Sequence, residues 1–391
     1  MQAKQPDYSL TGLFLITAVL MVGYGAVFTL LAEIRDQFGF SETGIGLIGG
    51  VAFVAGFVAQ IGAGKPVDLG HGKLVLRLGM VLALMGVGWM IVADSLAEWL
   101  ASRALFGFGS GCVRPAVRRL VMTVEPAQAG RNVGRLSAYE MSGFLLGPVI
   151  ASVITALFNM QATFIILSLL LIAMAPLVIK ADIPGAANPE LQGIYLRLLK
   201  KKPMQSSLAT GVAFYITVGV FEAIWAVFLA DKGASQMFIG LTMSLFALPM
   251  VFISPWAGAL AHTHGPLNIT IVTLSIATIC MICYGLLDSI YLLCIPMAIH
   301  AIADSFTMPA NQLAVGIASG EDALATGQGL FGAVGMAVAA ISAVGGGVFY
   351  EAFGATFLWQ ISALVMFLCL VFAWTKGADL RRSASLEAGG L

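Results

Sequence analysis

Long apolar stretches follow one another along almost the whole 391-residue chain. A helix needs about 20 consecutive apolar residues to cross a bilayer. Hydrophobic residues make up 59% of the sequence and charged residues 10%, whereas a typical soluble domain is about 25% charged. A soluble core cannot hide that much apolar surface. We therefore expect an all-α membrane protein that crosses the bilayer many times.

Twelve stretches are long enough to span the membrane, and they form two sets of six. They cover residues 11–34, 44–65, 74–94, 97–121, 133–157, 160–180, 206–231, 237–261, 267–287, 290–317, 325–350 and 354–375. The connection between the sets ends in the basic stretch NPELQGIYLRLLKKK, which is typical of a short amphipathic helix at a membrane surface. The predicted organisation is an N-terminal half at 1–180, a cytoplasmic linker at 181–205 and a C-terminal half at 206–391.

The two halves carry a weak internal repeat. A shift of 194 residues places residues 45–47 on 239–241, Gly64 on Gly258, and 115–116 on 309–310. Two parallel six-helix halves with a binding site between them are typical of secondary transporters.

The distribution of lysine and arginine predicts the orientation. Of the 20 such residues, Arg103 and Arg114 lie within the fourth span, and only Arg35 and Lys232 fall on the side opposite the termini. Cytoplasmic loops carry an excess of these residues, so both termini and the linker are expected in the cytoplasm. The short loops favour a bacterial inner membrane.

The loop after the second span has the sequence GKPVDLGHGK, residues 64–73. It is similar to the G-x-L-A-D-R-x-G-R-K motif of the major facilitator superfamily, with matches at Gly64, Asp68 and Lys73. Pro66 departs from that motif. The resemblance implies the major facilitator fold, and it implies that Asp68 helps to latch helices during alternating access. The alternative for Asp68 is a simple solvated turn.

Two further motifs indicate a subgroup. RALFGFGSG, residues 103–111, is similar to the R-x-x-Q-G-x-G motif, in which the arginine is implicated in proton coupling. Gly143, Gly147 and Pro148 match the G-x-x-x-G-P core of the antiporter motif. Within the superfamily the chain therefore resembles the twelve-span drug/proton antiporters.

Ionisable residues within the spans are functional hypotheses, since a charge at the bilayer centre costs roughly 2.5–3.5 kcal/mol on insertion scales. They are Arg103, Arg114, Glu140, Glu222 and Asp304, with His300 one helical turn before Asp304. Asp304 is the first candidate for the proton carrier or cation-binding group, and Glu222 is the second. The alternative for Asp304 is a structural hydrogen bond to the backbone or to His300.

Two ion pairs follow from the expected depths of these residues. Arg103 in the fourth span can extend toward Glu33 at the end of the first, as a structural alternative to a coupling role. Arg114 and Glu140 lie at similar depth on consecutive spans, so we predict that they pair, either structurally or as a gate.

Aromatic residues near these charges are candidates for stacking on a flat or cationic ligand. They are Tyr24, Phe28, Tyr215, Trp225 and Phe306. The alternative is that they face lipid or the protein core.

Several function classes have no support in the sequence. The net charge is zero, which gives no electrostatic basis for nucleic-acid binding. No nucleotide-binding loop, hydrolase motif or cofactor fingerprint is present, so we expect neither an enzyme nor a cofactor, but transport driven by a proton gradient. Cys280 and Cys283 are interpreted as apolar side chains rather than metal ligands.

The sequence therefore predicts a proton-coupled secondary transporter, working as a monomer, that exports small amphipathic molecules. One alternative is a symporter or uniporter for uptake of a small metabolite. Another is a non-transporting membrane sensor of the same fold.

Overall fold

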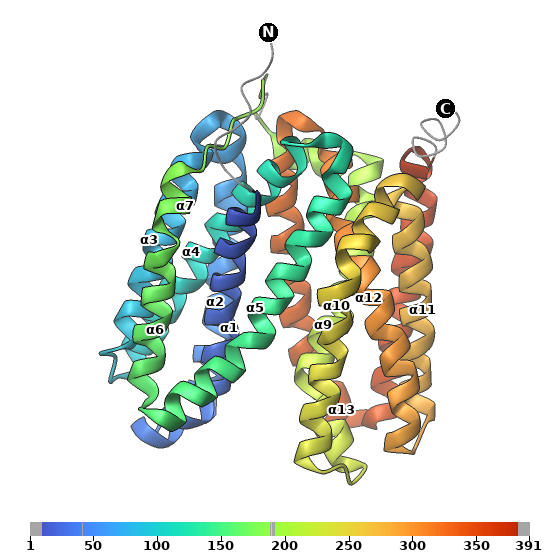
Figure 1. Ribbon diagram of the computed structural model, residues 1–391. Coiled ribbons are helices and arrows are strands. Elements are labelled where there is room, and N and C mark those ends of the chain that lie inside the picture. The colour runs from blue at the N-terminus through green and yellow to red at the C-terminus, as the bar shows by residue number, and fades with distance from the viewer. Residues whose placement is uncertain (1–9, 41, 188, 190–191, 382–391) are drawn as a thin grey trace. The chain divides into compact units, whose positions relative to one another are not determined.

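The computed structural model describes residues 10–40, 42–187, 189 and 192–381, and every regular element within them is a helix (Figure 1). The first part of the chain forms α1 (Leu10–Phe38), α2 (Glu42–Pro66), η1 (Val67–His71), α3 (Gly72–Met90), α4 (Leu96–Thr123), η2 (Pro126–Gln128), α5 (Ala129–Leu157), α6 (Met160–Ala173) and α7 (Ala175–Lys180). The second part forms α8 (Ile194–Lys200), α9 (Lys202–Asp231), α10 (Gln236–His264), α11 (Pro266–Leu286), α12 (Ile290–Ser319), η3 (Glu321–Ala323) and α13 (Leu324–Lys376).

Each of the twelve predicted spans coincides with a helix. The described residues hold nine stretches that are long and apolar enough to cross a membrane. One of them, Leu47–Met90, contains both α2 and α3, and another, Glu321–Lys376, contains two helices joined at Gly354. The charged helix α4 is not among the nine, and it completes the twelve.

Two boundaries differ from the sequence prediction. The predicted sixth span is divided into α6 and α7 at Met174. The eleventh and twelfth spans are continuous in α13, which changes direction at Gly354. The φ of Gly354 is 82°, a left-handed conformation that glycine adopts without steric cost.

The linker holds the short helix α8, whose two sides differ in burial. Ile194 and Leu198 are buried, whereas Leu196 and Leu199 are exposed next to basic residues. A short helix is therefore present in the linker, but its exposed side carries two leucines as well as basic residues.

The chain divides into two compact units. Unit 1 contains Met1–Val124, Tyr139–Gln192 and Glu321–Ala333, and unit 2 contains Glu125–Ala138, Gly193–Gly320 and Val334–Leu391. The predicted halves follow chain order, but the start of α5 packs within unit 2 and the start of α13 packs within unit 1.

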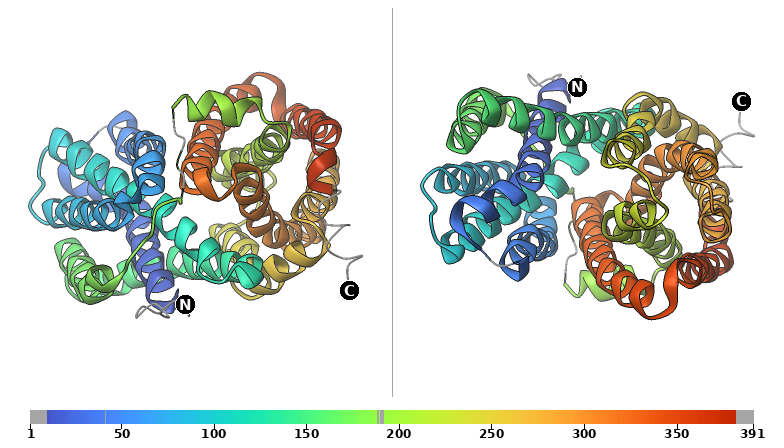
Figure 2. Two further views of the ribbon diagram at one scale, coloured as in Figure 1. Left: turned by 90° about the horizontal axis from the view of Figure 1, so that it is seen from above. Right: turned by 90° about the horizontal axis from the view of Figure 1, so that it is seen from below.

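In unit 1, α4 packs against α2 and α3 (Figure 2). Glycines on α4 allow these helices to approach closely. A Cβ atom added to Gly107 would clash with the backbone of Ala52 in α2, and one on Gly109 would clash with Ala83 in α3. Small residues serve this purpose in membrane helices, where van der Waals packing drives association. In unit 2, α12 takes the corresponding place and packs against α9, α10 and α11.

Candidate functional site

Arg103 lies on α4 inside an aromatic box in unit 1. The helix starts at a capping box between Ser95 and Glu98, and Arg103 follows after about two turns. Its guanidinium carbon lies 5.1 Å from the ring centre of Tyr24, 5.3 Å from that of Phe28 and 5.7 Å from that of Phe106. Such rings attract a cation through their quadrupoles.

Arg103 does not form the alternative ion pair with Glu33 that the sequence left open. Arg103 is 0% exposed, and none of its three guanidinium nitrogens has a hydrogen-bond partner among the described residues. Glu33 is exposed near the end of α1. The arginine turns into the interface of α1 and α4, away from the helix end where the carboxylate lies.

The predicted ion pair between Arg114 and Glu140 is wrong. Arg114 Nη2 donates to the sulfur of Met21 at 3.1 Å, and its guanidinium carbon lies 6.0 Å from the ring centre of Tyr24. No ion pair in the described part of the chain joins it to the half-buried Glu140 on α5. The side chain extends toward α1, and similar depth on consecutive helices does not bring two residues together.

Tyr24 is fixed between the two arginines. Its hydroxyl lies 2.8 Å from Ser110 Oγ, and Ser110 Oγ in turn donates to the carbonyl of Gly107 at 3.0 Å. The Tyr24 hydroxyl therefore donates to Ser110. The predicted aromatics Tyr24 and Phe28 both belong to this site.

Asp68 forms a buried network at the end of unit 1 where α13 begins. Its Oδ1 accepts from Arg119 Nη1 and from the amide of Ala325, each at 2.9 Å. Its Oδ2 accepts from the amide and hydroxyl of Thr326 at 2.7 and 2.6 Å. The carboxylate thus occupies the N-terminus of a helix, where unsatisfied amides and the helix dipole favour negative charge.

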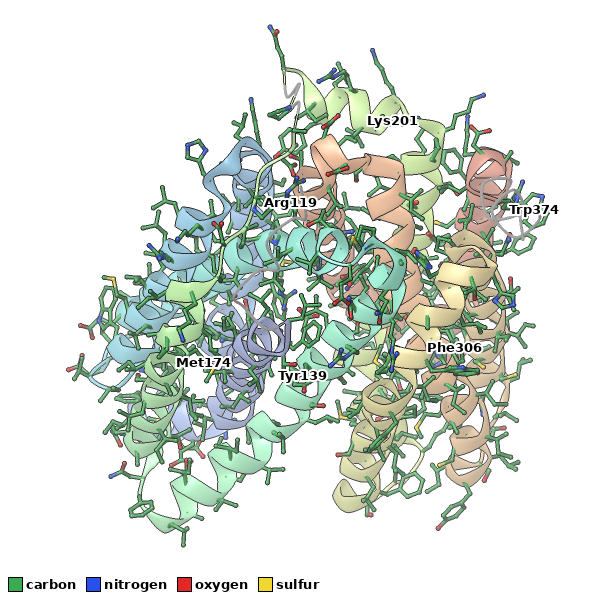
Figure 3. All side chains as sticks on the ribbon, turned by 45° about the horizontal axis from the view of Figure 1, so that its top comes forward. Arg119, Tyr139, Met174, Lys201, Phe306 and Trp374 are labelled. Carbon is green, nitrogen blue, oxygen red and sulfur yellow. The ribbon has the colours of Figure 1, made fainter. Side chains whose placement is uncertain are left out.

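Arg119 extends this network (Figure 3). Its Nη1 also donates to the carbonyl of Glu321 at 2.7 Å, and its Nε donates to the carbonyl of Pro184 at 2.9 Å. A solvated turn at Asp68 is excluded, since Asp68 is 0% exposed. Lys73 lies in the first turn of α3 and takes no part in these contacts.

The antiporter-motif residues lie where α5 crosses α1. A Cβ atom on Gly143 would clash with the carbonyl of Ala18, and one on Gly147 would meet the backbone of Val22 and Gly25. Pro148 packs against Gly25 at the same crossing. The motif therefore allows close approach of two helices.

His300 and Asp304 lie in the interior of unit 2. His300 Nε2 is 3.6 Å from Asp304 Oδ2, and the Tyr284 hydroxyl is 3.2 Å from His300 Nδ1. Asp304 is 2% exposed, and its Oδ1 has no hydrogen-bond partner in the described structure. Both side chains lie in the interior of the helix bundle of unit 2.

Aromatic rings surround this pair. The rings of Phe221 and Phe246 each lie edge-on to His300 at 5.4 Å. Trp225 is buried in the same cluster and donates to Thr242 Oγ1 at 3.1 Å. Glu222 lies on α9 between two cluster members, but its side chain is outside the described residues.

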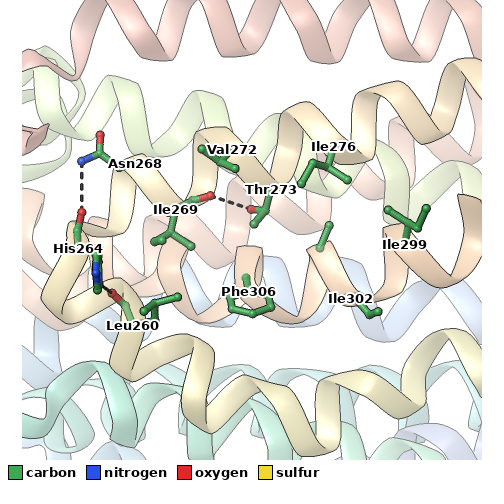
Figure 4. A pocket seen from close by; sticks show the side chains of 11 residues that line it. Leu260, His264, Asn268, Ile269, Val272, Thr273, Ile276, Ile299, Ile302 and Phe306 are labelled. Atoms are coloured by element: carbon green, nitrogen blue, oxygen red, sulfur yellow. Dashed lines mark hydrogen bonds between the residues drawn. The ribbon is translucent and has the colours of Figure 1, made fainter.

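The other two predicted aromatics lie elsewhere in unit 2. Tyr215 packs against Gly335 and forms an edge contact with Phe214 at 5.3 Å. Phe306 lines an apolar cavity of about 390 Å³ between α10, α11 and α12 (Figure 4). No group of three potential metal ligands occurs within the described ranges.

Comparison with known proteins identifies the family. Residues 13–225 and 206–390 match the model of the Major Facilitator Superfamily. The chain belongs to this superfamily. It is accordingly a multi-pass membrane protein.

Two bacterial drug-resistance proteins are among the relatives of this superfamily member. It is 22% identical over 219 residues to the quinolone resistance protein NorA of Staphylococcus aureus (strain MSSA476), covering 55% of this chain and 56% of NorA. It is 24% identical over 281 residues to the multidrug resistance protein MdtG of Enterobacter lignolyticus (strain SCF1), covering 68% and 66%. The chain spans about half the length of NorA in this match.

Solved structures confirm the fold. The human organic anion transporter MFSD10 (TETRAN) superimposes with a TM-score of 0.77 at 16% identity, covering 93% of this chain and 98% of that one. The transporter FucP in the outward conformation gives 0.74 at 14% identity, covering 94% and 98%.

Sequence reasoning missed three partners in these sites. Arg119 counts only among the basic residues on the predicted cytoplasmic side, although its place at the end of an apolar helix, next to another arginine, is a usable signal. Thr326 and Tyr284 carry no such signal, since their roles depend on which helices lie side by side.

Proposed function

We propose that this superfamily member exports small amphipathic molecules by alternating access and that export is coupled to proton movement in the opposite direction. The relatives named for quinolone and multidrug resistance support the direction and the substrate class. The chain's own antiporter-motif glycines, Gly143 and Gly147, support the same choice.

The observation that carries proton coupling is the buried pair of His300 and Asp304. Burying a carboxylate without a hydrogen-bonded partner costs free energy, and a bound proton removes that cost. His300 offers a second titratable group 3.6 Å away. A proton bound to this pair is therefore held by the apolar surroundings until the protein changes conformation.

Asp68 and Arg119 serve as the latch of this cycle. Their network ties η1 and α4 to the start of α13. When this network breaks, water must hydrate a buried ion pair and several hydrogen-bonding groups at the same time. The protein therefore favours two discrete conformations, with the network intact or broken, over a range of intermediate ones.

The remaining parts of the proposal concern the setting. Both termini and the linker lie in the cytoplasm, the membrane is a bacterial inner membrane, and the functional unit is a monomer of two six-helix halves. Protons and the exported molecule are the partners, and no cofactor takes part.

The test uses purified protein in liposomes that contain a pH-sensitive dye. An inward gradient of ethidium or norfloxacin is imposed on wild type, on Asp304→Asn and on the matched control Asp288→Asn, whose carboxylate is exposed and paired with Lys232. Antiport predicts alkalinisation of the lumen in wild type and the control, and its loss in Asp304→Asn.

Other outcomes contradict the proposal in different ways. Acidification of the lumen shows symport. Substrate uptake without a pH change shows a uniporter or another coupling ion. Failure of both compounds to move contradicts export of this substrate class.

A further inference from the structure

Arg103 and Arg114 project from one face of α4. They are 11 residues apart, which is close to three full turns at 3.6 residues per turn. Both approach the same Tyr24 ring, at 5.1 Å and 6.0 Å from its centre. Two positive charges therefore share one aromatic residue of α1.

No carboxylate neutralises either charge in the part of the chain that the structure describes. The three nitrogens of Arg103 lack hydrogen-bond partners, and Arg114 donates to a thioether sulfur, a weak acceptor. The surrounding side chains are Tyr24, Phe28 and Phe106, which carry no charge. Burying an unpaired charge is costly, and a purely structural role would be filled as well by a methionine of similar length.

We propose that Arg103 and Arg114 bind the carboxylate of an aromatic organic acid, and that such acids are substrates. The planar guanidinium donates two parallel hydrogen bonds to a carboxylate, which favours this group over a neutral amide. The flat rings of Tyr24, Phe28 and neighbouring Phe53 favour an aromatic body beside it. This inference rests on the proposed function, whose substrate it specifies.

Access of a ligand to Arg103 requires movement of the side chains that cover it. Arg114 and Phe28 are half-buried, whereas Arg103 is fully covered. Of the three rings around the Arg103 guanidinium, only Phe28 is half-buried, so movement of this ring is the expected route from Arg114 to Arg103.

The test measures binding of three matched probes to the full chain in detergent by isothermal titration calorimetry. The probes are 2-naphthoate, 2-naphthamide and 2-naphthylmethylammonium. The variants are Arg103→Gln, Arg103→Lys and Arg114→Gln, with Arg131→Gln as the control because Arg131 is exposed on α5. Elution as a single species in size-exclusion chromatography checks that each variant is folded.

Wild type and the control are expected to bind 2-naphthoate at least about tenfold more tightly than the amide, as a charge-assisted bidentate pair predicts. Arg103→Gln removes this preference, and Arg103→Lys and Arg114→Gln reduce it. If Arg103→Gln does not fold, the other two variants carry the test.

Three results overturn the proposal. They are equal affinity of wild type for naphthoate and amide, no naphthoate binding at millimolar concentration, and a preference of wild-type strength in both Arg103→Lys and Arg114→Gln. If titration with sodium chloride gives a binding signal and the three probes show no difference in affinity, the two arginines bind an inorganic anion. This result also overturns the proposal. Because binding is measured without transport, a carboxylate preference in a protein that transports no compound contradicts transport but supports the binding site. Transport of ethidium without any carboxylate preference contradicts only the site.

Discussion

Arg119 Nη1 and Asp68 Oδ1 lie 2.9 Å apart, and the two side chains are 2% and 0% exposed. Asp68 also accepts from the amides of Ala325 and Thr326. A single buried carboxylate therefore connects η1, the end of α4 and the start of α13, which are far apart in sequence. Removal of one partner from such a pair leaves an uncompensated charge.

Replacement of Asp68 by asparagine is expected to lower the free energy of unfolding by up to about 3–5 kcal/mol, the range for one-sided removal of a buried ion pair. Thermal unfolding of the purified protein, followed by tryptophan fluorescence, measures the effect. Asp36→Asn is the matched control, because Asp36 pairs with Arg35 at the surface, where ion pairs contribute about 0–1 kcal/mol. Equal unfolding temperatures for the two variants would show that the Asp68 network does not hold these segments together.

Gly64→Ala is expected to destabilise the protein by about 1–3 kcal/mol, the usual cost of overpacking. An added Cβ would lie 2.7 Å from the Cα of Thr326 and 2.8 Å from the carbonyl oxygen of Ala325, and neither backbone atom can move away easily. Gly62→Ala is the control, since nothing lies within 4 Å of its added Cβ. The same unfolding experiment compares them, and a stable Gly64→Ala variant would mean that α13 does not approach α2 this closely.

Tyr284→Phe removes the hydroxyl that contacts His300 Nδ1 at 3.2 Å. A lost buried hydrogen bond is expected to cost about 1 kcal/mol of stability. Because the same hydroxyl orients His300 toward Asp304, we also expect weaker substrate-driven pH changes in liposomes, with substrate binding retained. Tyr291→Phe, at a tyrosine that is 72% exposed, should leave both properties unchanged. Unaltered coupling in Tyr284→Phe would remove Tyr284 from the proton site.

The membrane-spanning helices were predictable because hydrophobic length is a local property of the sequence. All twelve predicted spans coincide with helices. The partners of Arg103 and Arg114 were not predictable, because contacts between side chains are not a local property of the sequence. Depth along a helix follows from residue number, but the direction of a side chain depends on which neighbouring backbone lies beside it.

The number of spans, the superfamily and the set of ionisable residues within the helices can all be read from the sequence. The folded structure is needed to see that Arg103 faces aromatic rings instead of Glu33, and that Asp68 caps α13 instead of facing water. The physical reason is that the free energy of transfer into a membrane is a sum over consecutive residues. Ion pairs and helix caps instead require atoms of two distant segments to lie within about 3 Å of each other.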